Sequence, residues 1–373
     1  MSILIAAFAI SVVATLYLVR LSKRHDAPWS DHDTDGPQKF HVHPVPRAGG
    51  VGIVLGLLGA FVLLWLQNGP WGETALALMA CGVPAFAFGL AEDVTKRVSP
   101  RARLLATAVS AALAFWLLDA AIRRTDIPGL DDLVALGAGS AVVTVFAVAG
   151  IANSVNIIDG FNGLASMCVV LILASLAYVG FVVGDPLITL LALAGIGAVL
   201  GFFVWNFPAG LIFLGDGGAY FLGFYVAELA LLLLVRNPQV SPLFPLLVCV
   251  YPAFETLFSI YRRKVLRALP PSVPDGIHLH SLIYRRIIRW AVGDRSAKAL
   301  TRRNSMTSPF LWMLCMLSVL PAVLFFDSSA WMAVFLLLFG IVYVGLYWRI
   351  VRFKSPRWMR ALATRPGRLE PRH

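Results

Sequence analysis

The stretch IFLGDGGAYFLGFYVAELALLLLVR, residues 212–236, places one aspartate among glycines at the start of a long apolar run. A helix that crosses the hydrocarbon core of a bilayer needs about 20 mostly apolar residues, and residues 219–235 come close to that length. Charged side chains are costly in lipid, so those retained there commonly serve a function. The stretch therefore predicts a membrane-spanning helix with a functional group, Asp216, at its beginning.

The composition of the whole chain extends this prediction. Of 373 residues, 59% are hydrophobic and 14% are charged, whereas soluble domains carry roughly 25% charged residues. The mean hydropathy is +0.79. These values predict an all-α, polytopic membrane protein with about 11 transmembrane helices. The expected spans are 2–19, 49–67, 74–91, 102–119, 133–152, 163–183, 185–204, 219–235, 242–261, 307–326 and 330–350.

The positions of the basic residues predict the orientation. If the chain alternates sides at each span, 28 of its 31 lysines and arginines fall on one side, leaving Arg123, Arg124 and Arg236 on the other. Basic residues collect on the cytoplasmic face, so we expect a periplasmic N-terminus and a cytoplasmic C-terminus. Topology thus accounts for the net charge of +11 without a nucleic-acid partner.

A single catalytic domain is the simplest division of the chain. We expect a transmembrane domain over 1–350, with a cytoplasmic substrate segment at 262–306, followed by a basic cytoplasmic tail at 351–373. The first span lacks a basic segment before it and a small-residue cleavage site, which favours a retained helix over a signal peptide.

Five polar motifs all fall on the predicted cytoplasmic side. A transporter more often places polar groups at mid-membrane, on broken helices, whereas these lie at helix ends. The arrangement predicts a site where a water-soluble substrate meets a membrane-embedded one. The motifs are HVHPVPRAGG (41–50), AEDVTKRVSPRAR (91–103), NSVNIIDGFNG (153–163), NFPAGLIFLGDGG (206–218) and PDGIHLHSLIYRR (274–286).

Two neighbouring acids, Glu92 and Asp93, end the third span. Neighbouring helical residues point about 100° apart, so both cannot aim equally at one atom. We expect one to bind or move a proton while the other orients it. A solvated helix end is the alternative, because charges at a span boundary are common.

The third motif spaces Asn153, Asn156 and Asp159 by three residues, with Asn162 after them. If the helix over 133–152 continues for two more turns, the first three share a face. Carboxamides suit hydrogen bonds to a base or sugar, and Asp159 suits a ribose, a sugar hydroxyl or a metal ion. An asparagine-rich helix C-cap is the alternative, although it would explain only one of these groups.

Asp216 precedes the start of an apolar helix and has glycines on both sides. Glycine lets a backbone approach a ligand closely, and the free N–H groups of a helix N-terminus attract phosphate. An aspartate would repel phosphate unless a cation lay between them. Mg²⁺ fits, because it takes one or two carboxylates together with substrate phosphates. The alternative is an N-cap, a position that favours aspartate.

The first and last motifs carry weaker signals. Arg47 follows a rigid Pro-x-Pro and is placed to neutralise a phosphate, and His278 and His280 lie in the most basic segment, where imidazoles suit a pyrophosphate. Two further acids lie inside spans. Glu228 is expected to face protein rather than lipid, and neither Glu228 nor Glu255 receives a role from the sequence.

Taken in order, the five motifs resemble those of the polyprenyl-phosphate N-acetylhexosamine-1-phosphate transferases, glycosyltransferase family 4. The pattern Asn-x-x-Asn-x-x-Asp-Gly-x-Asn-Gly is intact at 153–163, and Gly-Asp-x-Gly is intact at 215–218. The pattern His-x-x-Pro-Thr-Pro-Arg-x-Gly-Gly occurs at 41–50 with Val45 in place of threonine. The match spans roughly residues 35–290.

Two departures from the family pattern bear on function. Glu92 stands where the family has its first aspartate, before the intact Ser-Pro-Arg-x-Arg-Leu, and Ser281 replaces the last histidine of His-Leu-His-His. The longer histidine-rich ending of the phospho-MurNAc-pentapeptide transferase branch is absent, which favours the non-peptidoglycan branch.

The resemblance implies a reaction and its partners. Undecaprenyl phosphate would attack the β-phosphate of a UDP-N-acetylamino-sugar, UDP-GlcNAc or a relative, and UMP would leave. Direct attack is favoured over a covalent phospho-enzyme. The expected cofactor is Mg²⁺, with Mn²⁺ as an alternative. The expected location is the bacterial inner membrane, with the site on the cytoplasmic face among membrane lipids, and a homodimer is left open. A pentapeptide-bearing donor and a non-catalytic lipid- or sugar-binding homologue are the alternatives.

The resemblance also distributes roles among the residues. It assigns catalysis to Glu92, Asp93 and Lys96; metal binding to Asp216 and Asp159; and substrate binding to Arg47, Asn153, Asn156, Asp159, Asn162, His278 and His280.

Overall fold

The computed structural model describes residues 1–24, 30–31, 45–266, 277–288 and 296–352. These residues are helical almost throughout, and their one sheet is an antiparallel pairing of β1 (Ser30–Asp31) with β2 (Val45–Pro46). The all-α prediction is confirmed. The long helices are α1 (Ser2–Arg24), α2 (Gly49–Gln67), α3 (Gly69–Thr95), α4 (Pro100–Leu117), α6 (Gly137–Ile158), α7 (Leu164–Val182), α8 (Pro186–Asn206), α9 (Gly215–Arg236), α14 (Ala297–Leu324) and α15 (Ser329–Val351).

Nine helices in the described part of the chain are long and apolar enough to cross a membrane. They are all the long helices except α4, which has 18 residues and carries Arg101 and Arg103. The chain is therefore a multi-pass membrane protein. Large apolar side chains project from the outer helices, as contact with lipid requires; examples are Trp116, Phe146, Phe181 and Leu337. The number of spans and their orientation stay predictions.

The span predicted over 242–261 is broken into two shorter helices, α10 (Phe244–Val248) and α11 (Val250–Tyr261). Pro252 explains the position of the break, because proline has no N–H to donate to the carbonyl of Val248, four residues earlier.

The segment after α11 contains several short elements. They are the π-helices η1 (Arg262–Leu266) and η2 (Tyr284–Ile288), with α12 (Leu279–Ile283) before η2. Helix α14 begins at Ala297 rather than at 307, so it takes up the last part of the predicted substrate segment. Most of the predicted basic tail, residues 353–373, lies outside the described residues.

Helix α9 is the centre of the bundle and packs against α2, α3, α6 and α7. Its most apolar stretch is 94% buried. The backbones approach closely at its start: a Cβ on Gly50 would lie 2.4 Å from the Cα of Gly218, and one on Gly89 would lie 2.6 Å from the Cα of Gly217. Gly217 and Gly218, which follow Asp216, therefore allow neighbouring helices to pack closely. The expectation that glycines here give a ligand access to the backbone does not account for these two residues.

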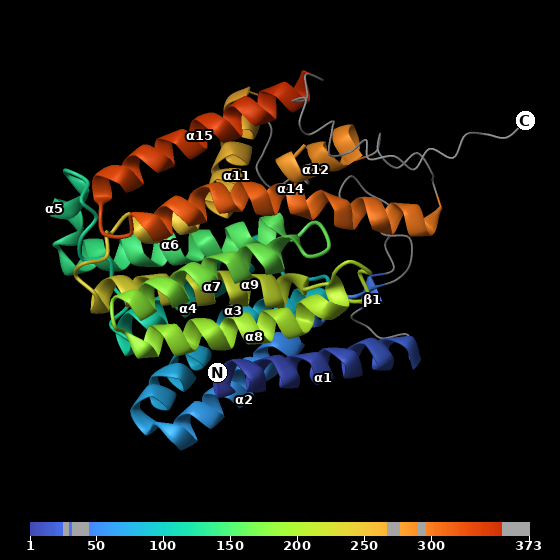
Figure 1. Cartoon of the computed structure of the whole chain (residues 1–373), viewed down its shortest axis with the longest axis horizontal. Coiled ribbons are helices and arrows are strands. Elements are labelled where there is room, and N and C mark those ends of the chain that lie inside the picture. Colours follow the sequence, from blue (N-terminus) through green and yellow to red (C-terminus); the bar gives the residue numbers. More distant parts are fainter. Residues whose placement is uncertain (25–29, 32–44, 267–276, 289–295, 353–373) are drawn as a thin grey trace, which may run out of the picture.

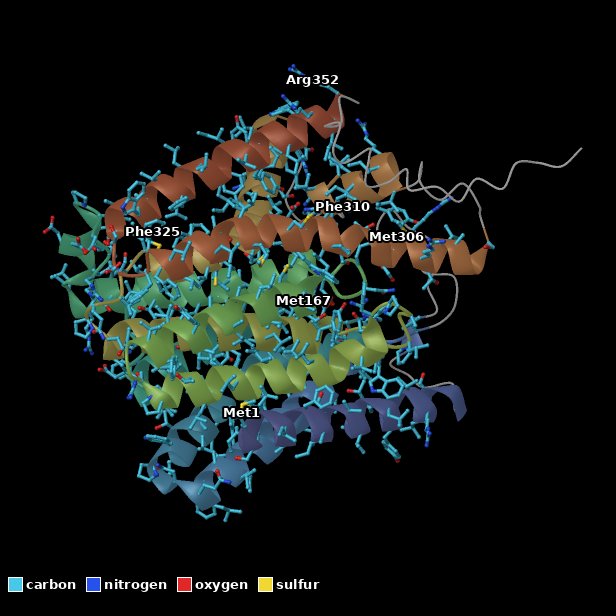
Figure 2. The ribbon with its side chains drawn as sticks, viewed as in Figure 1. Met1, Met167, Met306, Phe310, Phe325 and Arg352 are labelled. Carbon is cyan, nitrogen blue, oxygen red and sulfur yellow. The ribbon has the colours of Figure 1, made fainter. Side chains whose placement is uncertain are left out.

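The elements that carry the polar motifs lie towards one end of the bundle. In Figure 1, β1, the turn between α6 and α7, and α12 lie on the right, whereas the short helix α5 (Leu130–Val134) lies at the opposite end. Side chains fill the spaces between the helices (Figure 2); Met306 lies within the long helix α14, and Phe325 directly follows its end.

Candidate active site

Asp216, in the first turn of α9, is contacted by side chains from three other segments. Arg47, just before α2, donates from Nη2 to Oδ1 over 3.0 Å, and Asn156 of α6 donates to the same oxygen over 3.2 Å. Arg103 of α4 pairs with Oδ2. The N-cap position belongs to Leu214, so Asp216 is not a simple helix cap. Four of the five predicted motifs therefore meet at Asp216.

Asp93, near the end of α3, is 1% exposed and ties Arg47 to the start of α9. Its Oδ2 accepts a hydrogen bond from the Gly217 N–H at 3.0 Å, and its Oδ1 lies 3.2 Å from Nε of Arg47. The first N–H groups of a helix lack partners within the helix, and Asp93 satisfies one of them. Arg47 consequently bridges two aspartates, Asp93 and Asp216.

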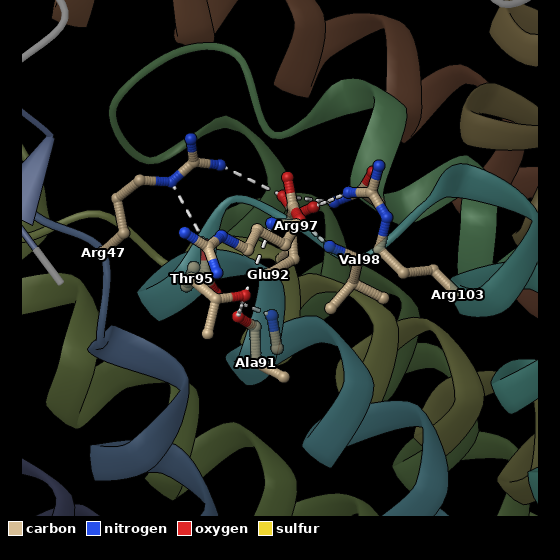
Figure 3. Close-up of polar contacts among 11 residues, drawn as sticks. Arg47, Ala91, Glu92, Thr95, Arg97, Val98 and Arg103 are labelled. Atoms are coloured by element: carbon tan, nitrogen blue, oxygen red, sulfur yellow. Dashed lines mark hydrogen bonds and ion pairs between the residues drawn. The ribbon is translucent and has the colours of Figure 1, made fainter.

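Glu92 faces away from Asp93, as the angle between neighbouring helical residues predicts. Its carboxylate accepts a hydrogen bond from the Val98 N–H at 2.8 Å, which stabilises the turn after α3. Lys96 ends α3 in a left-handed conformation with φ 55°, and its N–H bonds to the carbonyl of Glu92. Figure 3 draws Glu92 with its neighbour Val98 and with Arg47 and Arg103, the two arginines of the cluster. The catalytic roles of Glu92, Asp93 and Lys96 stay predictions.

Helix α6 continues to Ile158, beyond the expected span of 133–152, and brings the third motif to the site. Asn156 reaches Asp216, whereas Asn153 donates to Oγ1 of Thr107 on α4 at 3.2 Å and to the carbonyl of Ala149 at 2.7 Å. Asn153 therefore braces α6 against α4 and does not reach Asp216.

Asp159 occupies the C-cap of α6, and its carboxylate has no hydrogen bond or ion pair among the described residues. Its burial raises the pKa to about 7, against the effect of the Arg47 charge, which lowers it. The negative charges of Asp216 and Asp93 raise it further. Asp159 is thus close enough to the cluster to interact with its charges and still has its oxygens available.

The turn after Asp159 is held from the side by α14. The backbone N–H of Asn162 donates to Oδ1 of Asn304 at 2.8 Å, and Oγ of Ser308 donates to the carbonyl of Asn162 at 2.6 Å. The Asn162 side chain donates to Oγ of Ser305 at 3.2 Å. At the next residue, Nε1 of Trp312 donates to the Gly163 carbonyl at 3.0 Å. Asn162 is 4% exposed and its described contacts are to protein; its predicted contact with substrate is untested.

The fifth motif packs against the third. Nδ1 of His278 lies 3.0 Å from Oε1 of Glu255 on α11. The rings of His278 and His280 stack with centroids 5.1 Å apart, and the ring of His280 lies 5.5 Å from that of Phe161. His280 therefore lies beside the turn that carries Asp159, and His278 stacks on His280; the phosphate contacts predicted for both histidines stay predictions.

Comparison with known proteins gives the family. A family model described as glycosyl transferase family 4 matches residues 75–234, which include Asp93, Arg103, Asn156, Asp159 and Asp216. The phospho-N-acetylmuramoyl-pentapeptide-transferase of Clostridium botulinum (strain Eklund 17B / Type B) is 31% identical over 241 residues, which cover 61% of this chain and 70% of the relative. The chain belongs to glycosyl transferase family 4.

Two other members of family 4 match more of the chain. A Bacillus subtilis (strain 168) protein named "Probable undecaprenyl-phosphate N-acetylglucosaminyl 1-phosphate transferase" is 26% identical over 347 residues, 92% of this chain and 90% of the relative. The undecaprenyl-phosphate alpha-N-acetylglucosaminyl 1-phosphate transferase of Thermotoga maritima is 28% identical over 69% of this chain and 74% of the relative.

The acidic residues of this family 4 site fit a magnesium ion that shares its coordination with phosphate. Among the described residues no three or more His, Cys, Asp or Glu side chains gather as a complete metal site. Mg²⁺ is commonly held by one or two carboxylates, with phosphates and water as its other ligands. Asp216 and Asp159 offer such carboxylates. The two arginines that pair with Asp216 also suit phosphate as a partner, and a bound phosphate would take the place of Asp216 in those pairs.

Sequence reasoning missed Arg103, which pairs with Asp216 and lies with its guanidinium carbon 5.9 Å from the ring centre of Tyr220. The residue does lie in the family 4 pattern Ser-Pro-Arg-x-Arg-Leu, which was the available signal. A basic residue is equally typical of the cytoplasmic face of any membrane protein, so its charge alone does not indicate a role in the site. The clamp on Asn162 from α14 and the contact of Glu255 with His278 were also missed, and no local pattern in the sequence marks them.

Proposed function

We propose that this protein transfers N-acetylglucosamine 1-phosphate, or a closely related N-acetylhexosamine 1-phosphate, from a UDP-sugar to undecaprenyl phosphate and releases UMP. The observation that carries the proposal is the junction of Arg47, Arg103, Asn156 and Asp216, built from four separate segments of a family 4 chain. The relatives that cover most of the chain bear names for this reaction, which supports the choice of sugar and lipid.

The proposed step forms one P–O bond and breaks another. An oxygen of the lipid phosphate attacks the β-phosphorus of the UDP-sugar, and the bond from that phosphorus to the oxygen of UMP breaks. Phosphoryl transfer needs chiefly positioning and neutralisation of charge. A phosphate monoester has its second pKa at about 6, so the attacking group is already largely ionised at neutral pH and a strong base is not required.

The side chains divide this work. The guanidinium groups of Arg47 and Arg103 would exchange their ion pairs with Asp216 for ion pairs with the phosphates, and so neutralise the phosphate charge. Guanidinium groups bind phosphate through paired N–H donors. Asp93 would keep Arg47 and the start of α9 in register. Asp216 and Asp159 would hold Mg²⁺, which when bound supplies positive charge to the pyrophosphate.

The distribution of basic residues supports a location in the inner membrane with the cluster at the cytoplasmic end. With this orientation a UDP-sugar reaches the cluster from the cytoplasm, and the lipid phosphate reaches it from the bilayer. Positive charge on that face would also favour both anionic substrates.

The test is release of UMP by purified protein in detergent or nanodiscs, with undecaprenyl phosphate, MgCl₂ and a panel of UDP-sugars. We expect UMP with UDP-GlcNAc or a related UDP-N-acetylhexosamine, and none when the lipid phosphate or the metal is withheld. Release only with the UDP-MurNAc-pentapeptide donor would select that alternative. Absence of UMP with every donor would reject the enzyme proposal.

A further inference from the structure

We propose that Glu255 is a positioning residue for the active site: it fixes the orientation and tautomer of the His278 imidazole and, through His278, sets His280 against the turn that carries Asp159. Glu255 received no role from the sequence. The kinetic part of the test rests on the proposed function, whereas the spectroscopic part does not.

Glu255 is a buried acid with every oxygen in use. It is 1% exposed. Its Oε1 accepts from the backbone N–H of Leu279 at 3.0 Å and lies 3.0 Å from Nδ1 of His278, and its Oε2 accepts from the Tyr343 hydroxyl at 2.7 Å. A buried carboxyl group without partners would be strongly destabilising, and here three groups from two other segments satisfy it.

These contacts decide which nitrogen of His278 carries a proton. The Leu279 N–H can only donate, and the Tyr343 hydroxyl donates to the other oxygen, so Glu255 acts as an acceptor. An ionised carboxylate has no proton to give, and Nδ1 of His278 must therefore donate to it. The second ring nitrogen, Nε2, is then directed away from Glu255. A carboxylate on one imidazole nitrogen fixes the tautomer and ring orientation in this way.

A series of contacts leads from His278 to the catalytic cluster. The ring of His278 stacks on that of His280 at an interplanar angle of 10°. A Cβ on Gly160 would lie 3.4 Å from Nε2 of His280, and the His280 ring meets Phe161 edge to face. Gly160 follows Asp159 directly in the chain. A rotation of the His278 ring would therefore shift His280 and, through it, the turn that carries the available carboxylate of Asp159.

A separate set of contacts anchors the backbone of the same segment. Arg262 donates from Nη1 to the carbonyl of Ile277 at 2.7 Å and to the Tyr347 hydroxyl at 2.7 Å. Because these bonds do not involve Glu255, the segment stays attached to η1, which directly follows α11, and to α15 when Glu255 is changed. A variant at Glu255 is thus expected to fold, so that a change in its activity reports the loss of the contact with His278.

The chain offers a matched control in Glu228 of α9. This acid is also fully buried in a long helix, and neither of its oxygens has a hydrogen-bond partner among the described residues. Glu228→Gln makes the same chemical change as Glu255→Gln at a buried site without a histidine, and we expect it to leave turnover near the native value.

The kinetic test is a double-mutant cycle on UMP release, using Glu255→Ala, Glu255→Gln and His278→Ala. Removing the partner of an oriented histidine lowers activity about 10- to 100-fold, so we expect that loss in kcat/KM for Glu255→Ala. Glu255→Gln keeps an acceptor oxygen for Nδ1 and is expected to recover most of it. In the His278→Ala background Glu255→Ala should have less than about a twofold effect, because the residue it acts through is gone.

Two kinetic results would overturn the proposal. One is native activity in Glu255→Ala; the other is the same loss on changing Glu255 in both backgrounds, which would indicate a general structural role. If Glu255→Ala does not give a monodisperse protein, the cycle is run with Glu255→Gln, for which a small loss that disappears without His278 is expected.

The spectroscopic test needs no turnover. In protein labelled with ¹⁵N-histidine, the signal of His278, assigned by its loss in His278→Ala, should show a proton on Nδ1. A neutral ring with the proton on Nε2 alone would overturn the proposal. If the native protein releases no UMP with any donor, the proposed function fails while this spectrum still decides the role of Glu255.

Discussion

The two ends of α9 carry the same kinds of side chain and use them differently. At its C-terminal end, Asp185 accepts hydrogen bonds from Nε of Arg236 at 2.7 Å and from Nδ2 of Asn237 at 3.1 Å, and it also caps α8. Burial opposes ionisation there, but these hydrogen bonds hold the pKa of Asp185 below its ordinary value. The carboxylate of Asp185 thus has all its partners within the protein, and in this sense the network is closed.

At its N-terminal end, α9 begins inside a network that is not closed. Asp93 and Asp216 share Arg47, and Asp216 also pairs with Arg103. Asp159 has no partner among the described residues, and burial raises its pKa to about 7. A partly buried acid without a partner does not stabilise a fold. The comparison indicates that the closed end stabilises the fold, and it supports the proposal that a cation and a phosphate complete the open end.

The largest expected effect comes from Asp216→Asn, which removes the charge on which both arginines converge. We expect UMP release to fall at least about 100-fold, because neither the metal nor the arginines keep their place. Asparagine retains an oxygen for Arg47, so the variant should elute as a monodisperse protein. Substantial activity of the variant at saturating Mg²⁺ would show that Asp216 is not a metal ligand, and the proposed functional difference between the two ends of α9 would then be wrong.

Asp159→Asn should lower turnover and stabilise the metal-free protein. A carboxyl group with a folded pKa of about 7 holds its proton more tightly than in the unfolded chain, where the pKa is about 3.9. Its contribution to stability therefore falls as pH rises from about 4 to about 7, and asparagine avoids that loss. We expect a Tm about 2–4 °C higher at pH 8 in EDTA, with the gain vanishing near pH 4. Equal Tm values of the native protein and the variant at pH 8 would show that the charge of Asp159 is already balanced by its surroundings.

Asn304→Ala should have a smaller effect on turnover, because it loosens the clamp on the turn without touching the cluster. Misplacement of reacting groups lowers rate, and we expect kcat to fall about 3- to 10-fold on this ground. Ser318→Ala is the control on the same helix, since Oγ of Ser318 bonds only to the carbonyl of Cys315 in the described contacts. Equal kcat values in the two variants would argue that α14 does not position the turn.

Asp185→Asn should have the least effect on catalysis and the clearest effect on stability. Loss of a charged acceptor for Arg236 is expected to lower the free energy of unfolding by about 1–3 kcal/mol, measured as reduced Tm in detergent, with kcat per folded molecule unchanged. The native protein should lose this contribution as pH falls through the lowered pKa of Asp185, and the variant should not. A matching loss of kcat would mean that the two ends of α9 are coupled.

The sequence predicted the features that depend on local composition. The helix bounds differ from the expected spans, since α6 continues to Ile158 and α9 begins at Gly215, with Asp216 inside its first turn rather than before it. Nine of the eleven expected spans nevertheless coincide with helices that are long and apolar enough to cross a membrane. Length and hydropathy are enough for this, because lipid requires every spanning segment to be apolar and to satisfy its own backbone. The break before Pro252 was not predicted, although the proline was visible.

The partners of each polar side chain depended on tertiary packing. Arg103 meets Asp216 across 113 positions in the chain, and Tyr343 meets Glu255 across 88. The sequence by itself determined a family 4 membrane protein with acids and amides at one end of its helices. Only the packing of α3, α4 and α6 around α9, and of α11 against α6 and α15, decided which acids are paired and which stay available. A side chain's partners are set by helices far apart in sequence.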